Sequence, residues 1–320
     1  MKLVIQIPAW NEEEHLPRAL AALPATLPGF DQVEVQVVDD GSVDRTAEVA
    51  RQHGAHVVSL CTHRGLAIAF SAGLKAALAR GADVIVNTDA DSQYEADDIP
   101  SLVAPILRGE AEMVVGDRQV QTLGHFSPTK RLLQRLGSAA VRRLSRTPVA
   151  DATSGFRAIS REAALKLHVF TRFTYTVETL LQAGEAGLRV VSIPIRVRTE
   201  VRRPSRLFHS NLGYVLRSLE SIARIVILYN PLRIFLRVGA VPILLGLLLI
   251  LRFLYFYLTG DSPSGHVQSL LIAVVLVVVG VQVWVVGILA DLIAVNRRLL
   301  EEAVYDQRRR AAGVDHSEVE

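Results

Sequence analysis

The 320-residue chain contains a single cysteine, Cys61, which excludes an intrachain disulfide and a zinc site built from several cysteines. It also lacks the two common glycine-rich phosphate-binding signatures. There is no GxxxxGK[ST] segment, and no GxGxxG follows the first apolar run. P-loop nucleotide hydrolases and dinucleotide-binding enzymes are therefore poor interpretations. The formal net charge is only +3, so bulk charge does not indicate a nucleic-acid partner.

Long apolar runs are nearly absent before residue 230 and dominate the chain after it. Residues 234–258 and 267–290 are each long enough to cross a bilayer as a helix, at about 1.5 Å per residue. Arginines flank the pair on both outer sides, while the short connecting loop carries Asp261. The positive-inside rule predicts a membrane hairpin at 233–296 in a multi-pass protein of the cell inner (plasma) membrane. Both termini, including a tail at 297–320, would be cytoplasmic.

Strand and helix patterns alternate in the first part of the chain. Five short apolar runs predict strands at 3–7, 33–38, 55–59, 83–87 and 113–115. The small apolar residues of 66–79 predict a packed helix. Such alternation is typical of an α/β domain with a mainly parallel sheet covered on both faces. After the first strand, Asn11 is expected to cap a helix, with Glu14 completing a capping box.

Carboxylates follow several of the predicted strands, and the carboxyl ends of parallel strands meet at one edge of a sheet. The triplet Asp89-Ala90-Asp91 follows a buried strand. A spacing of two on an extended segment directs both side chains to the same side. Hard carboxylate oxygens suit Mg²⁺ or Mn²⁺, and Gln93 is in register to assist. A capped turn is the plain alternative for an isolated triplet of this kind.

Residues 118–150 combine arginines with regularly spaced leucines, which predicts a basic amphipathic helix. This helix could be a solvated surface helix, or it could lie on an anionic membrane or grip a phosphate. A second basic segment follows at 202–206. Residues 209–232 are expected to form a juxtamembrane helix that leads to the hairpin.

Five segments together resemble the family 2 glycosyltransferases of the GT-A fold, and their order is similar to that of the polyprenyl-phosphate (dolichyl-phosphate) sugar synthases. The segments are IPAWNEE (7–13), VVDDGSVDRT (37–46), NTDADSQ (87–93), VVGDR (114–118) and TSGFRAISRE (153–162). The resemblance covers about residues 1–210, and the hairpin also resembles that of bacterial members. It implies a Rossmann-like GT-A catalytic domain at 1–208, followed by amphipathic interface helices and two transmembrane helices.

The resemblance also implies a role for each matching residue. Catalytic roles would fall to Asp89, Asp91, Arg118, Arg131 and Glu178, although Glu178 is equally consistent with a structural role. The metal, Mg²⁺ or Mn²⁺, would be held by Asp89, Asp91 and Gln93. The acceptor phosphate would be bound by Arg118 and Arg131, close to Ser154. The donor nucleotide would be held by Pro8, Trp10, Asn11, Glu12, Asp39, Asp40 and Asp89, with Arg202 and Arg206 closing over its diphosphate.

Two features of processive polysaccharide synthases are missing: the QxxRW motif and an acidic pair that supplies a base, where this chain has Thr176-Val177-Glu178. A hydroxyl acceptor needs a base, whereas a phosphomonoester is already anionic at pH 7. The sequence thus favours inverting transfer of a hexose from a UDP- or GDP-sugar to a polyprenyl phosphate in the bilayer. A hydroxyl acceptor, with Glu178 or Asp151 as base, is the first alternative. A tethered nucleotide-sugar-binding protein without turnover is the second, and a homo-oligomer stays open.

Overall fold

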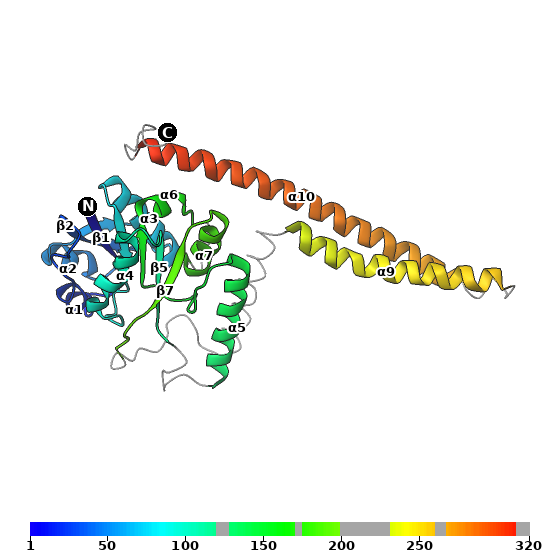
Figure 1. Cartoon of the computed structure of the whole chain (residues 1–320), viewed down its shortest axis with the longest axis horizontal. Coiled ribbons are helices and arrows are strands. Elements are labelled where there is room, and N and C mark those ends of the chain that lie inside the picture. Colours follow the sequence, from blue (N-terminus) through cyan, green and yellow to red (C-terminus); the bar gives the residue numbers. More distant parts are fainter. Residues whose placement is uncertain (120–127, 170–174, 199–230, 260–266, 312–320) are drawn as a thin grey trace. The chain divides into compact units, whose positions relative to one another are not determined.

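The computed structural model describes residues 1–119, 128–169, 175–198, 231–259 and 267–311 (Figure 1). The chain divides into two compact units, one comprising Met1–Ser218 with Val304–Glu320 and the other Leu219–Ala303. The predicted juxtamembrane helix at 209–232 falls almost wholly outside the described residues, and the basic segment 202–206 falls entirely outside them.

A seven-stranded sheet in the order β3-β2-β1-β4-β6-β5-β7 forms the centre of the first unit. All of its neighbours are parallel except those of β6, which runs antiparallel to both β4 and β5. The predicted α/β class with a mainly parallel sheet is therefore confirmed, with β6 as an unpredicted strand. The strands are β1 (Lys2–Ala9), β2 (Gln32–Asp39), β3 (His56–Ser59), β4 (Val84–Asn87), β5 (Met113–Asp117), β6 (Arg157–Ser160) and β7 (Val190–Pro194).

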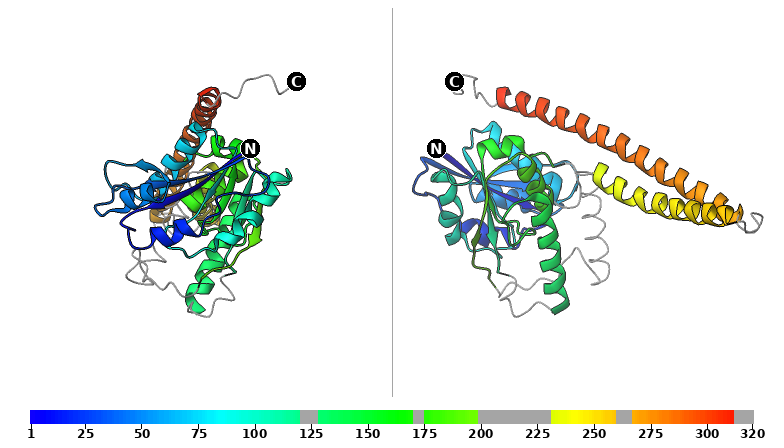
Figure 2. Two further views of the ribbon diagram at one scale, coloured as in Figure 1. Left: turned by 90° about the vertical axis from the view of Figure 1, so that its left-hand side faces the viewer. Right: turned by 45° about the vertical axis from the view of Figure 1, so that its right-hand side comes forward.

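Helices cover both faces of this sheet (Figure 2). Because neighbouring residues of a strand point to opposite faces, Val4 and Ile85 join a core with α3, α5 and α7, while Leu3 and Val84 join one with α4. Strands buried on both sides are mainly apolar, which explains the apolar runs of these segments. The helices are α1 (Leu16–Ala21), α2 (Thr46–Gln52), α3 (Leu66–Ala79), α4 (Ile99–Leu107) after the 3₁₀ turn η1 (Ala96–Asp98), α5 (Pro128–Ser145), α6 (Arg161–Lys166) and α7 (Tyr175–Glu185).

The predicted cap at Asn11 is wrong. Helix α1 begins only at Leu16, with His15 in the N-cap position. Asn11 instead has a positive φ of 51°, and its side-chain oxygen accepts a hydrogen bond from the Val43 amide at 2.9 Å. An asparagine tolerates this left-handed conformation better than most residues, so its local role is to turn the chain at the end of β1.

The second unit contains α9 (Pro231–Leu258) and most of α10 (Val267–Ala311). Pro231–Leu258 and Val267–Arg297 are long and apolar enough to cross a membrane, with mean hydropathies of 2.6 and 2.8. The two predicted apolar spans thus form helices, and α10 continues past residue 290. Glycines bring the two helices together: a Cβ on Gly280 would lie 2.4 Å from the side chain of Ile243. Small residues at such an interface allow close backbone packing within a bilayer.

Candidate active site

Two loops are joined beyond the carboxyl ends of β1 and β2. The Asn11 amide donates to the Ser42 hydroxyl at 3.0 Å, and the Val43 amide donates to the Asn11 side chain. The Glu12 amide donates to the Thr46 hydroxyl at 2.8 Å. These bonds link segments more than 30 residues apart, so the predicted donor residues after β1 and β2 lie side by side.

Asp40 ties a third loop to this edge. Its carboxylate accepts hydrogen bonds from the amides of Arg64 and Gly65, both at 2.8 Å, and lies 2.8 Å from His63 Nδ1. The residue is almost fully buried. Asp40 was predicted to hold the donor nucleotide, and in the structure its oxygens are occupied by the loop that leads into α3. Its neighbour Asp39 accepts from the Ser42 amide at 3.0 Å.

The Asp89-Ala90-Asp91 segment follows β4 at the same edge. Asp91 accepts a hydrogen bond from the Gln93 amide at 3.0 Å, and the buried Tyr94 lines the same small pocket as Asp89. Burial, followed by the charge of the nearby Asp91 carboxylate, raises the pKa of Asp89 to about 7. The two carboxylates therefore repel one another, a situation that a divalent cation would reverse.

The donor set around this segment is small. Among the residues that the structure describes, no group of three or more histidine, cysteine, aspartate and glutamate side chains is arranged to hold a metal ion. A pair of carboxylates without a third acidic ligand fits Mg²⁺ or Mn²⁺ that keeps some waters and takes substrate phosphate oxygens. Asp89 and Asp91 fit the predicted metal in this sense.

A network of buried hydrogen bonds lies next to Asp89. Gln6 donates to the Asn87 side-chain oxygen at 2.9 Å, and the Asn87 amide donates to the Gly155 carbonyl and the Tyr175 hydroxyl at 2.8 and 3.0 Å. The Gly155 amide in turn donates to the Tyr94 hydroxyl at 3.2 Å. A Cβ on Gly155 would lie 2.9 Å from that Tyr175 hydroxyl and 3.1 Å from an Asp89 carboxylate oxygen. Gly155 therefore permits a close approach of its loop to the predicted metal ligand.

Arg118 is paired with Asp151, in the same loop as Gly155. The guanidinium donates from Nε and Nη2 to the two carboxylate oxygens at 2.6 and 3.0 Å, and from Nη2 to the Thr153 hydroxyl at 2.6 Å. Among the described residues, none accepts from Nη1. Although burial disfavours its charge, Asp151 has a lowered pKa because of the Arg118 guanidinium. An anchored carboxylate of this kind is a poor candidate for the base that the sequence left open.

Arg157 lies fully buried beneath the same loop. It donates to the carbonyls of Ser154 and Ala152 at 2.8 and 3.0 Å and to the Thr179 hydroxyl at 2.7 Å. The predicted acceptor residue Ser154 is also fully buried, and its hydroxyl has no partner among the described residues. Arg157 thus fixes the backbone on which the predicted site residues stand.

Four predicted residues are placed only in part or lie outside the described residues. Glu178 lies in the first turn of α7, and its side chain is buried in the interior of the domain. Arg131 belongs to α5, which confirms the predicted helix, but its side chain lies outside the described residues. Arg202 and Arg206 also lie outside them.

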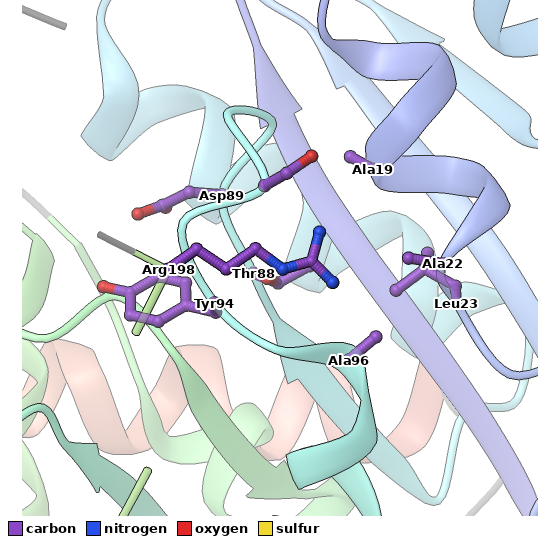
Figure 3. Close-up of a pocket in the computed structure, with 9 residues that line it drawn as sticks. Ala19, Ala22, Leu23, Thr88, Asp89, Tyr94, Ala96 and Arg198 are labelled. Carbon is purple, nitrogen blue, oxygen red and sulfur yellow. The ribbon is translucent and has the colours of Figure 1, made fainter. Parts of the chain in front are cut away.

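A small pocket lies between the Asp89 segment and α1, as Figure 3 shows. Its polar lining is Thr88, Asp89, Ser92, Tyr94 and Arg198, and the apolar lining is Ala19 of α1 with Ala22, Leu23 and Ala96. The Arg198 amide donates to the Gln93 carbonyl at 2.9 Å, and its guanidinium donates to Glu95 at 2.7 and 2.6 Å. The chain that leaves β7 is therefore anchored beside the predicted metal site.

Sequence reasoning missed several residues of this site. Tyr94, Tyr175 and Gly155 contact Asp89 or its immediate supports, and His63 contacts Asp40. Gly155 belongs to the TSGFRAISRE segment, so this motif could have identified it. The sequence prediction assigned a role there only to the neighbouring Ser154. The two tyrosines and His63 carry no pattern of their own in the sequence.

Two family models match the two parts of the chain. Residues 4–167 match the family model described as glycosyl transferase family 2, and residues 230–295 match the GtrB C-terminal hairpin. An uncharacterized glycosyltransferase of Mycobacterium tuberculosis is 35% identical over 219 residues, which cover 68% of this chain and 95% of the relative. The undecaprenyl-phosphate mannosyltransferase of Micrococcus luteus is 30% identical over 206 residues, 61% of this chain and 83% of the relative.

A solved structure shares the fold. The crystal structure of glucosyl-3-phosphoglycerate synthase from Mycobacterium tuberculosis in complex with Mn²⁺ and UDP-glucose has a TM-score of 0.53 and 26% sequence identity, covering 70% of this chain and 78% of that one. The family model alone spans more than half of the chain. The sheet order, the carboxylates at its edge and these similarities agree: the chain belongs to glycosyl transferase family 2 and is a glycosyltransferase.

Proposed function

We propose that this glycosyltransferase moves a hexose from a UDP- or GDP-sugar to a polyprenyl phosphate, with inversion at the sugar C1, on the cytoplasmic face of the membrane. One observation carries the proposal. The loop that holds Arg118 through Asp151 and Thr153 also contacts Asp89 through Gly155. One loop thus contacts both the carboxylate that would bind the cation of a donor diphosphate and the guanidinium that would bind an acceptor phosphate.

The donor half is supported by the loops after β1 and β2 and by the carboxylate pair. Mg²⁺ or Mn²⁺ held by Asp89 and Asp91, with Gln93 nearby, would offset charge on the departing nucleoside diphosphate. The structural neighbour crystallised with Mn²⁺ and UDP-glucose supports the choice of a divalent metal. Arg202 and Arg206 follow the anchored Arg198 in the sequence and would close over the diphosphate.

The acceptor half is supported by the Micrococcus luteus relative, whose name states an undecaprenyl-phosphate acceptor. It is also supported by two helices long and apolar enough to hold the protein at a bilayer. The Nη1 group of Arg118 would bind the acceptor phosphate, together with Arg131 from the basic helix α5. Guanidinium groups bind phosphate oxygens strongly and offset the repulsion between two anionic substrates.

The reaction needs no strong base. An acceptor phosphate oxygen, already anionic, would attack C1 of the sugar, and the bond from C1 to the diphosphate oxygen would break in line with it. Arg118 would orient the attacking phosphate, and the loop fixed by Arg157 would hold that guanidinium in place. Such positioning of two reactants accounts for much of the rate of a transfer reaction.

The test is a donor and acceptor screen with the purified full-length protein in detergent. UDP-glucose, UDP-N-acetylglucosamine and GDP-mannose would each be offered with undecaprenyl phosphate or with undecaprenol, and the lipid product would be identified by mass. We expect one donor to give a sugar phosphate lipid, and only from the phosphate. Transfer to undecaprenol that is lost in Glu178→Gln would instead favour a base-dependent hydroxyl acceptor.

The metal role has its own control. Asp91→Ala should abolish transfer, whereas Asp97→Ala, at an exposed carboxylate six residues away, should leave it unchanged. EDTA should stop the wild-type enzyme, and Mn²⁺ or Mg²⁺ should restore it. Full activity in Asp91→Ala, or in EDTA, would sink the metal assignment.

A further inference from the structure

An aromatic pair stands at the edge of the sheet where the loops after β1, β2 and β3 meet. The rings of Trp10 and His63 stack with their centroids 4.0 Å apart and their planes 21° from parallel. Both side chains are partly exposed, Trp10 by 38% and His63 by 47%. Trp10 covers one face of the imidazole, and the exposed fraction of His63 leaves surface on this side chain for a ligand.

His63 is held more firmly than a surface histidine usually is. Its Nδ1 lies 2.8 Å from the buried Asp40 carboxylate, which also accepts the two backbone amides that follow, those of Arg64 and Gly65. The backbone beside it is fixed as well. Gly41 has a φ of 68°, and a Cβ there would lie 2.6 Å from the backbone nitrogen of His63. Three segments of the chain thus set the position of the imidazole before any ligand arrives.

We infer that His63 is a nucleobase-binding residue of the donor site, and that the base stacks on the imidazole face that Trp10 leaves open. The inference rests on the proposed function, which assigns this edge to the donor nucleotide. Every nucleobase has a flat π-face, so an aromatic ring binds it by stacking with little dependence on sequence. A ring fixed in advance loses little conformational entropy on binding, which favours affinity.

Two substitutions at His63 test the aromatic ring and the hydrogen bond to Asp40 separately. His63→Phe keeps an aromatic face against Trp10 but cannot bond Asp40. His63→Asn keeps a polar group near Asp40 but removes the ring. His53→Asn is the matched control, because His53 is an exposed histidine at the end of α2 that bonds only the Val49 carbonyl of its own helix.

The experiment is calorimetric titration of the full-length protein in detergent with UDP, GDP and inorganic pyrophosphate, each in the presence of Mn²⁺. His63→Asn should weaken both nucleotides about tenfold and leave pyrophosphate within about twofold, because a base–aromatic stack is lost and the diphosphate site is untouched. His63→Phe should stay within about threefold of the wild type for all three ligands, and His53→Asn should change nothing.

Three outcomes would overturn the inference. An equal loss for pyrophosphate and nucleotides would mean that His63 only holds the loop. Tighter nucleotide binding in His63→Asn would mean that the base displaces the imidazole and stacks on Trp10 itself. Wild-type protein that binds pyrophosphate but neither nucleotide would refute the proposed donor, and this inference with it. A loss confined to the nucleotides in His63→Asn would support it.

Discussion

Replacing Gly155 with alanine should misplace Asp89 while leaving the domain folded. The added Cβ would lie 2.9 Å from the Tyr175 hydroxyl and 3.1 and 3.4 Å from the two Asp89 carboxylate oxygens. The Tyr175 hydroxyl is not free to move away, because Tyr175 is fully buried and its hydroxyl accepts a hydrogen bond from Asn87. The loop and the carboxylate must therefore separate by a few tenths of an ångström.

The size of the effect follows from that displacement. A functional site tolerates errors of about 0.5 Å, and a misplacement of about 1 Å costs about 100-fold in rate. A shift of a few tenths of an ångström should therefore lower kcat/KM of Gly155→Ala by about 3- to 10-fold, which corresponds to about 0.7 to 1.4 kcal/mol of transition-state stabilisation. The Mn²⁺ affinity should fall in parallel. Overpacking of this kind should reduce the free energy of unfolding by about 1–3 kcal/mol.

The measurements are Mn²⁺ binding by electron paramagnetic resonance, steady-state kinetics, and chemical unfolding. Gly137→Ala is the control, because no atom lies within 4 Å of a Cβ at this position in α5, and it should raise the unfolding free energy by about 0.5–1 kcal/mol. Adding Tyr175→Phe to Gly155→Ala removes the nearest oxygen, so the double variant should recover part of the Mn²⁺ affinity. Wild-type affinity and rate in Gly155→Ala would refute the proposed link between this loop and Asp89.

Two further predictions concern charge. Asp151→Asn leaves the largely buried Arg118 without its counter-charge, so chemical unfolding should show a loss of about 3–5 kcal/mol; the acceptor KM should rise more than the donor KM, and an equal rise would contradict the assignment of Arg118. Because burial and Asp91 raise the pKa of Asp89 to about 7, protons compete with the metal. Mn²⁺ affinity, measured without nucleotide, should therefore rise about tenfold per pH unit from pH 5 to 7 and then level off, and a flat profile over that range would count against Asp89 as a ligand.

The architecture was predictable from the sequence because its signals are local. A strand buried on both faces is apolar along most of its length, and the helix predicted at 66–79 is found with the same bounds. Strand β6 gave no such signal: it has only four residues, and it is defined by antiparallel pairing with β4 and β5. The capping prediction at Asn11 was wrong for a related reason. Its conformation is set by Ser42 and Val43, some 30 residues away, which outweigh the local capping pattern.

The residues of the candidate site also fall into a group that the sequence predicts and a group that it does not. The position of the carboxylates at one edge follows from the parallel sheet alone, so Asp39, Asp40, Asp89 and Asp91 could be grouped without a structure. Their supports could not. Asn87 reaches Tyr175 across 88 positions of the chain, and Tyr94 reaches Gly155 across 61. Nothing in the spacing of these residues records that contact, because it arises only once β4 and β6 pair.

The loop from Asp151 to Phe156 connects the two halves of the proposed site by charge as well as by contact. Arg118 and Asp151 form a neutral pair at one end of it. Arg157, beneath it, donates to carbonyl and hydroxyl oxygens that carry no charge. Burial lowers its pKa only to about 10, so it stays cationic at pH 7. The charge that favours the ionised state of Asp89 is that of Arg118, which opposes the rise of the Asp89 pKa. Arg157 acts through the backbone instead, because it fixes the loop that holds this guanidinium. One buried arginine would thus serve both substrates without touching either.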